Sequence, residues 1–181
     1  MRNKLTAKTI CTTAMLAALI YVVSLFGIPF FGSKIQLSNA LSILGGVLFG
    51  PGIGGIAAGL ADAIHDVLSG DNPIELVLSV AVKASMAVAA GIFWRSKVAE
   101  KFKEIARDAL AAAVGAVTYF LLHSAKHLIL KTLVDGLTLP AAFTALAAKT
   151  PATAINAVAA VILIAILARP IRLALTKSKV L

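Results

Sequence analysis

Six long apolar stretches, separated by short polar or turn-forming segments, constrain the fold of this chain more than any other feature. A helix needs about 20 residues to cross a hydrocarbon core about 30 Å thick. Backbone N–H and C=O groups in lipid must be satisfied within the segment, which favours helices over open strands. We therefore predict an all-α integral membrane protein, with a single six-helix transmembrane domain over residues 1–181 and helices at about 9–26, 37–49, 53–68, 74–94, 109–133 and 152–168.

The composition supports a lipid environment. Hydrophobic residues make up 60% of the 181 residues, charged residues only 14%, and the mean hydropathy is +0.96. A soluble domain of this length would need more polar surface to cover its core. The basic N-terminus followed by an apolar run resembles a signal peptide, but no small-residue cleavage site follows, so we expect the segment to be retained. The single cysteine, Cys11, rules out an internal disulfide.

The net charge of +9 is distributed very unevenly along the chain. Basic residues gather before the first helix, between the fourth and fifth helices, and after the sixth. Because loops rich in Lys and Arg stay on the inner side, this pattern predicts cytoplasmic termini in a multi-pass protein of the bacterial inner (plasma) membrane. The positive charge therefore indicates the topology of the chain in the membrane and does not indicate nucleic-acid binding. The residues are Arg2, Lys4, Lys8, Arg95, Lys97, Lys101, Lys103, Arg107, Arg169, Arg172, Lys177 and Lys179.

Polar and ionisable residues inside the predicted helices lie almost entirely in their outer halves. An ionisable residue at the centre of a membrane helix costs roughly 2.5–3.5 kcal/mol on insertion scales, so each is a functional candidate. The inner halves of the same helices are almost purely apolar. This asymmetry predicts a polar cavity that opens outward and binds a polar solute. The residues are Asp62, His65, Asp66, Lys83, Tyr119, His123, Lys126, His127, Lys149, Thr153 and Asn156.

Three other interpretations of these residues stay open. Asp62 or Asp66 can pair with Lys83 or Lys126 and simply hold the helices together. A metal-binding membrane enzyme or metal transporter would use mixed carboxylate and imidazole ligands on facing helices. A self-sufficient secondary transporter is disfavoured because no inverted repeat is visible. No phosphate loop, nucleophile elbow or zinc-protease motif is present, so we expect neither an enzyme nor a cofactor. The candidate metal set is Asp62, His65, Asp66, His123 and His127.

Two passages give the chain a family resemblance. The first is Ala14-Met15-Leu16-Ala17-Ala18-Leu19, and the second is Gly45-Gly46-Val47-Leu48-Phe49-Gly50-Pro51, which runs into Gly54-Gly55, Gly59 and Asp62. With the length, helix number and topology, they make the chain resemble the substrate-binding (S) component of energy-coupling factor (ECF) vitamin transporters. The resemblance covers nearly the whole chain.

The resemblance implies high-affinity capture of a vitamin or related micronutrient at the outer face. It also implies a transmembrane coupling protein and two cytoplasmic ATPase subunits as partners, with Ala14 and Ala18 at the coupling contact. It places the binding pocket between the first outer loop and helices four to six. Together with Asp62 and His65 from the polar stripe, the candidate substrate-binding residues are Lys34, Gln36, Asn39, Asp62, His65, Lys83, Tyr119, His123, His127, Lys149 and Asn156.

Some features depart from particular branches of that family. The chain starts Met1-Arg2, whereas nickel and cobalt members start Met-His, so we expect no such metal. The only tryptophan, Trp94, lies at the inner interface, where we expect a membrane-belt anchor and not a thiamin contact. Aromatic residues make up just 6%, which weakens the case for a large flavin-stacking site without excluding one. The Lys and His residues favour an anionic or acceptor-rich ligand.

Overall fold

The helices form one membrane-type bundle in the computed structural model, which describes residues 7–30 and 33–178. Four of the described helices are long and apolar enough to cross a membrane. The all-α, six-helix fold class predicted from the sequence is confirmed. The helices are α1 (Ala7–Ser24), α2 (Ser38–Phe49), α3 (Pro51–Ser69), α4 (Pro73–Trp94), α5 (Glu104–Ile129) and α6 (Leu139–Lys177).

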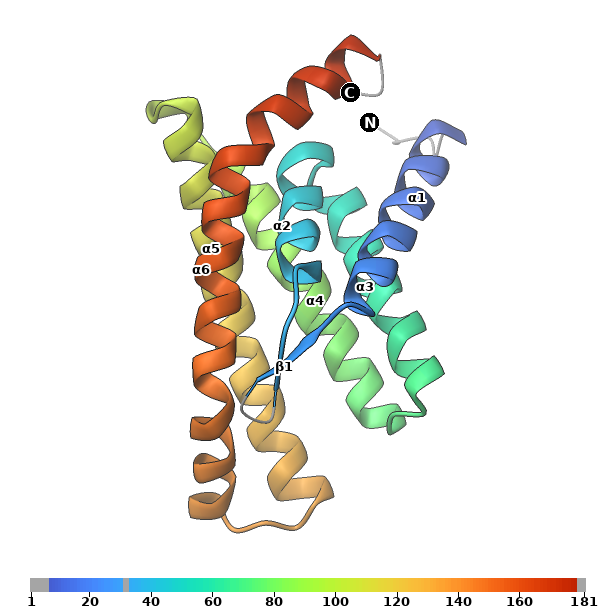
Figure 1. Cartoon of the computed structure of the whole chain (residues 1–181), viewed down its shortest axis with the longest axis vertical. Coiled ribbons are helices and arrows are strands. Elements are labelled where there is room, and N and C mark those ends of the chain that lie inside the picture. Colours follow the sequence, from blue (N-terminus) through green and yellow to red (C-terminus); the bar gives the residue numbers. More distant parts are fainter. Residues whose placement is uncertain (1–6, 31–32, 179–181) are drawn as a thin grey trace.

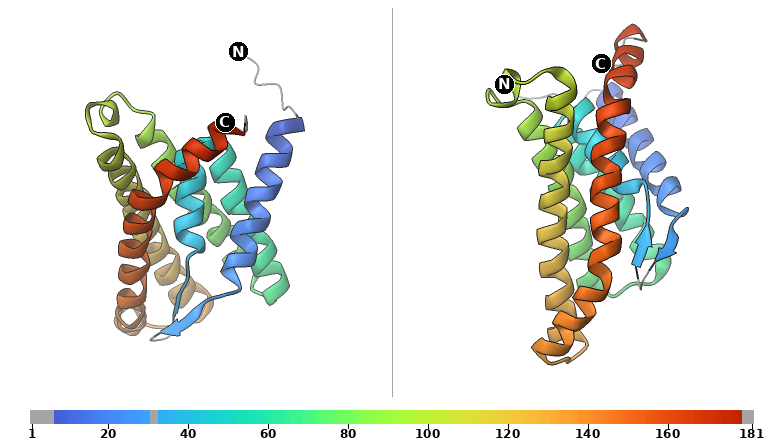
Figure 2. Two further views of the ribbon diagram at one scale, coloured as in Figure 1. Left: turned by 45° about the horizontal axis from the view of Figure 1, so that its top comes forward. Right: turned by 60° about the vertical axis from the view of Figure 1, so that its left-hand side comes forward.

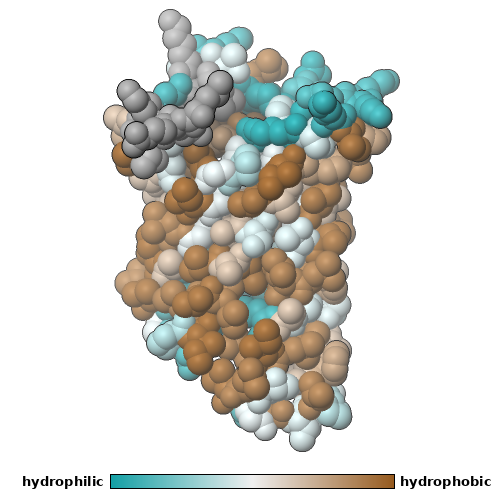
Figure 3. Space-filling view, turned by 180° about the vertical axis from the view of Figure 1, so that it is seen from behind, coloured by the Kyte–Doolittle hydropathy of each residue, from teal (hydrophilic) through white to brown (hydrophobic). Residues whose placement is uncertain are grey.

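Successive helices run in alternate directions, so the start of α1 and the end of α6 lie at the same end of the bundle (Figure 1). The α4–α5 connection, with the short helix η1 (Ala99–Lys101), lies at that end too, as both side views show (Figure 2). Hydrophilic side chains gather there, while apolar side chains cover most of the rest of the face in Figure 3. The basic clusters near Arg95 and Arg172 therefore lie at one end of the bundle, as the positive-inside interpretation requires.

A small β-hairpin at the opposite end was not predicted from the sequence. Strand β1 (Ile28–Phe30) pairs antiparallel with β2 (Ser33–Ile35), and Ile28 lies opposite Ile35. The hairpin connects α1 to α2, and in Figure 1 it lies across the end of the bundle away from the termini. Alternation over three residues is too short to stand out from the surrounding apolar sequence.

The sixth helix starts earlier than the predicted residue 152, so most of the stretch between the fifth and sixth predicted helices is itself helical. A π-helical turn, η2 (Leu130–Val134), extends α5, and α6 then begins at Leu139. Pro151 lies inside α6 and not at its first position. The residues before it are mostly alanine and leucine, and they continue the helix because helices satisfy the backbone best where water is scarce. A second internal proline, Pro170, precedes the last turns of α6, which bend over the end of the bundle (Figure 1).

The short helix α2 lies at the centre, where α3 and α4 approach it at glycine contacts. A Cβ built on Gly46 would lie 2.0 Å from the carbonyl oxygen of Ala87 in α4. A Cβ on Gly54 of α3 would lie 2.4 Å from the backbone nitrogen of Gly46. A Cβ on Gly91 of α4 would lie 2.6 Å from the carbonyl oxygen of Gly46. Such distances allow no side chain, so glycine is what permits these three backbones to pack in contact.

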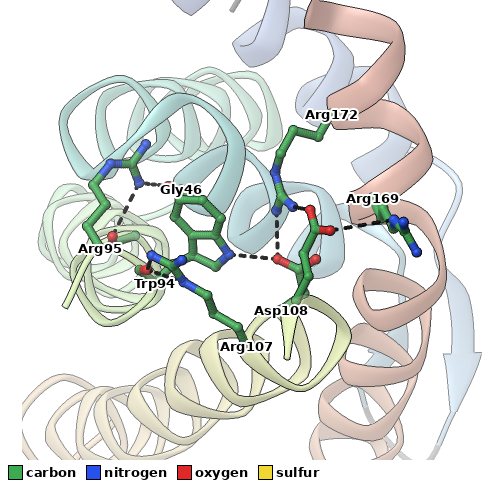
Figure 4. A network of polar contacts seen from close by, with 9 residues as sticks. Gly46, Trp94, Arg95, Arg107, Asp108, Arg169 and Arg172 are labelled. Carbon is green, nitrogen blue, oxygen red and sulfur yellow. Dashed lines mark hydrogen bonds and ion pairs between the residues drawn. The ribbon is translucent and has the colours of Figure 1, made fainter. Parts of the chain in front are cut away.

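At the end that holds the chain termini, a polar network ties α4, α5 and α6 together (Figure 4). Trp94, predicted as a membrane-belt anchor, donates an indole hydrogen bond of 2.7 Å to Asp108. Arg172 of α6 pairs with the same carboxylate at 2.6 Å and also with Glu104. Arg107 donates to the backbone carbonyl of Trp94 at 2.8 Å. The charged residues in the first turns of α5 thus have partners in α4 and α6.

Candidate functional site

A polar cavity of about 150 Å³ lies toward the hairpin end of the bundle. It is bounded by α3, α4 and α5 and by the residue that follows β2. Six of the predicted substrate-binding residues line it, namely Gln36, Asp62, His65, Lys83, Tyr119 and His123. Asp66, Ser79, Val82 and Lys126 complete the lining.

The ammonium group of Lys83 is the central polar group of this site. The residue is only 8% exposed, and its Nζ donates a 2.5 Å hydrogen bond to Oδ1 of Asn39 in α2. Asp62 of α3 holds a carboxylate oxygen 3.9 Å from the same Nζ. A buried charge is tolerated only when partners compensate it. The contacts thus link α2, α3 and α4, and they match the sequence-based alternative in which Asp62 pairs with Lys83.

One wall of the cavity is flat and aromatic. Tyr119 and His123 lie one turn apart in α5, with ring centroids 5.0 Å apart and planes inclined by 21°. The Lys83 Nζ lies 5.5 Å from the Tyr119 ring centroid, on the same side of the cavity. This arrangement places two aromatic rings and a cation at the cavity, a combination that suits a ligand with an aromatic ring and hydrogen-bond acceptors.

Lys126 lies at the α4 side of the cavity and has different partners from those the sequence suggested. Its Nζ donates to Oγ of Ser79 at 2.5 Å and lies 3.2 Å from a carboxylate oxygen of Glu75. Pairing with Asp62 or Asp66 was the sequence-based alternative, and neither of those pairs is among the ion pairs of the described residues. Ser79 lies one turn before Lys83 in α4, and that helical spacing is the signal that would have revealed it.

Asn156 of α6 fastens the hairpin to the bundle. Its Oδ1 accepts a 2.9 Å hydrogen bond from the backbone N–H of Gln36, and its Nδ2 donates to the backbone carbonyl of Lys34 at 2.9 Å. Both polar ends of this buried side chain are therefore used by the hairpin. The side chain of Lys34 is exposed, and its contribution to this contact comes from the backbone.

The other predicted residues lie outside the cavity lining. Asn39 reaches the site through Lys83, and with Tyr119 and Asn156 it lines a separate void of about 10 Å³. His127 is buried and Lys149 is half-buried, and both lie toward the end of the bundle away from the chain termini. Five residues form the predicted metal set, and among the described residues only His65 and Asp66 of that set belong to a cluster of potential metal ligands. The third residue of this cluster is Asp71.

The two residues predicted for partner coupling lie on an open helix face. Ala14 and Ala18 are both exposed on α1, which packs mainly against α3. Ala18 also lines an almost wholly apolar groove of about 1020 Å³ between α1, α2 and the last turns of α6. The groove lies toward the end of the bundle where the chain termini lie, away from the polar cavity.

Comparison with known proteins agrees with the fold and with the resemblance seen in the sequence. A family model for the S component of ECF-type riboflavin transporters matches residues 4–174. The chain therefore belongs to this family, and it is a subunit of a membrane transporter and not an enzyme. The family is the flavin branch, although the low aromatic content had weakened the case for a large flavin-stacking site.

A solved structure with a similar fold is described as the S component of a bacterial ECF transporter. It superposes with a TM-score of 0.62 at 21% sequence identity, over 91% of this chain and 95% of that one. At this identity the likeness concerns the fold alone. No curated protein matches the chain.

Proposed function

We propose that this S component captures riboflavin, or a closely related flavin, with high affinity in the polar cavity at the outer face of the cell membrane. The observation that carries the proposal is the position of the buried Lys83 ammonium beside the stacked Tyr119 and His123 rings. An isoalloxazine ring is flat and has carbonyl and ring-nitrogen acceptors along one edge. Stacking on the rings and donation from Lys83 would recognise both properties at once.

A carboxylate and an amide of the same cavity would bind the rest of a flavin. Asp62 accepts hydrogen bonds, and Gln36 both donates and accepts them. A ribityl chain presents several hydroxyl groups, which need such partners when they leave water. The proposal thus gives each part of the ligand a complementary group in the lining.

Capture requires the cavity to open. A volume of about 150 Å³ is below the roughly 300–1,000 Å³ of ordinary ligand sites. The hairpin is the outer cover nearest the cavity, and two hydrogen bonds to Asn156 attach it to α6. We expect the hairpin to swing away when the solute enters and to close over it afterwards.

Uptake would follow through partners, because this chain holds no energy source in its sequence. The basic residues at the end of the bundle that holds the chain termini support a cytoplasmic location for that end. A transmembrane coupling protein would contact Ala14 and Ala18 there, and two cytoplasmic ATPase subunits would drive reorientation. The exposed face of α1 and the adjoining apolar groove support this contact.

The test is a fluorescence titration of riboflavin with the purified protein in detergent, using vitamin-free preparations. We expect saturable quenching with one flavin per chain, and Lys83→Met should weaken binding about tenfold or more, since a charge-assisted hydrogen bond is worth about 1.5–3 kcal/mol. Lys131→Met, which removes a partly exposed lysine paired with Asp135, is the matched control.

A double variant separates binding from stability. Lys83→Met alone leaves Asp62 without its cation, whereas Lys83→Met with Asp62→Asn restores neutrality. Weak flavin binding in both variants, with normal melting behaviour in the double variant, supports the site. Tight riboflavin binding by the double variant would show that Lys83 does not contribute to the site. Absence of riboflavin binding by the unmodified protein would refute the flavin assignment.

A further inference from the structure

Three potential metal ligands meet at the end of α3, beside the polar cavity. The cluster consists of His65, Asp66 and Asp71, and one ligand atom from each lies within 4.8 Å of the others. His65 and Asp66 belong to the last turns of α3, while Asp71 lies in the turn that leads into α4. Asp71 has no part in the proposed flavin site.

The buried carboxylate of Asp66 is only half satisfied. The residue is 6% exposed, and its Oδ1 lies 3.3 Å from Nδ1 of His65. Its other oxygen, Oδ2, is buried without a hydrogen-bond partner among the described residues. Leaving a buried acceptor unpaired is unfavourable, and for a charged oxygen especially so. The contact with His65 accounts for one oxygen and leaves the second in need of a cation or donor.

The local field also favours a cation. The cluster lies at the carboxyl end of α3, where the helix dipole is negative and the last carbonyl groups point outward. Asp66 and Asp71 add two formal negative charges, which a divalent cation would balance. Asp71 is exposed, so an ion can reach the cluster from solvent.

We propose that His65, Asp66 and Asp71 bind one divalent cation of the zinc class at the outer end of α3. Two ligand atoms at about 2.0–2.1 Å from a tetrahedral zinc lie about 3.4 Å apart. The 3.3 Å separation of His65 Nδ1 and Asp66 Oδ1 matches that spacing, and an ion held by both oxygens of the Asp66 carboxylate would also give the unpartnered Oδ2 a partner. Asp71 supplies the third ligand after a small side-chain movement, and water takes the fourth position.

The ligand types select the metal. Calcium binds six to eight oxygens, and magnesium binds six ligands that are mostly oxygen and water. One imidazole with two carboxylates suits zinc, which forms sites with three protein ligands. A bound ion would join the last turn of α3 to the α3–α4 turn, because its ligands come from both segments.

The test is a zinc titration of the purified, tag-free and chelator-treated protein in detergent, in competition with a chromophoric zinc indicator. We expect one zinc per chain for the unmodified protein. Asp71→Asn and His65→Gln should each weaken binding more than about tenfold, since even outer-shell partners contribute 10–100-fold. Asp135→Asn, another exposed aspartate at the same end of the bundle, should leave the affinity unchanged.

A second measurement does not depend on the indicator. Zinc should raise the melting temperature of the unmodified protein and of Asp135→Asn but not that of Asp71→Asn, because only an ion bound to the folded cluster stabilises it. Equal zinc affinity in the unmodified protein and Asp71→Asn, or no stoichiometric binding at all, overturns the proposal. No vitamin is present in either measurement, so the result is independent of the proposed flavin binding.

Discussion

The indole Nε1 of Trp94 donates a 2.7 Å hydrogen bond to Oδ1 of Asp108, a side chain with no exposure to solvent. The same oxygen accepts a 2.6 Å bond from Arg172. Guanidinium groups of Arg107 and Arg172 lie 4.0 Å and 4.6 Å from the centroid of the Trp94 ring. One buried carboxylate and one indole thus join α4, α5 and α6 at the end of the bundle where the chain termini lie.

Asp108→Asn should destabilise the bundle strongly, because it removes the charge that Arg172 pairs with in a buried setting. We expect a loss of about 3 kcal/mol, as found when one member of a buried pair is removed. Glu104→Gln is the matched control, since Arg172 also contacts Glu104 but that side chain is 45% exposed. Its loss should be at most about 1 kcal/mol. Thermal unfolding in detergent measures both, and equal effects would show that burial does not govern this network.

Gly46→Ala should disrupt the contact between α2 and α4. The added Cβ would lie 2.0 Å from the carbonyl oxygen of Ala87, and a backbone atom cannot move aside without separating the helices. Overpacking of this kind costs about 3 kcal/mol, so we expect a large fall in melting temperature. At Gly52 in the first turn of α3, an added Cβ points into open space. Gly52→Ala should therefore be neutral or slightly stabilising.

Asn156→Ala should loosen the hairpin by removing both of its side-chain attachments to α6. We expect faster hydrogen–deuterium exchange at the Gln36 amide and faster release of bound flavin. Thr153→Ala is the control, because the Thr153 hydroxyl bonds to the Lys149 carbonyl within its own helix. Unchanged exchange at Gln36 in Asn156→Ala would mean that the hairpin is held by other contacts.

Ala18→Trp should block assembly with the coupling protein while sparing flavin binding. The indole would project from the exposed face of α1 into the apolar groove, far from the polar cavity. Copurification of the coupling protein from membranes measures assembly, and the riboflavin titration checks binding. Ala125→Trp on an exposed position of α5 is the control. Normal copurification of the coupling protein with Ala18→Trp would show that the coupling contact lies elsewhere on this chain.

The polar residues of α3, α4 and α5 were predictable as a group, and their partners were not. Spacing along each helix placed Asp62, Lys83 and Tyr119 in the same outer half, and the structure brings all three to one cavity. Asn156 was also predicted as a ligand contact, and this stays a prediction; the structure adds that both of its polar atoms bond to the backbone of residues 34 and 36. The periodicity of a sequence shows which residues share one face of a helix, but it does not show which groups of other helices they contact.

The sequence by itself determined the membrane environment, the number of helices, the polar and apolar halves and the family. The first three follow from hydropathy and charge along the chain, which need no knowledge of packing, and the family follows from the resemblance of the passages that begin at Ala14 and Gly45. Only the tertiary structure decided the hairpin, the early start of α6, and the contacts of Trp94 with Asp108 and of Asn156 with Lys34. Asn156 and Lys34 are 122 positions apart. Such pairings depend on how closely and at what rotation the helices pack, as the glycine contacts between α2, α3 and α4 illustrate.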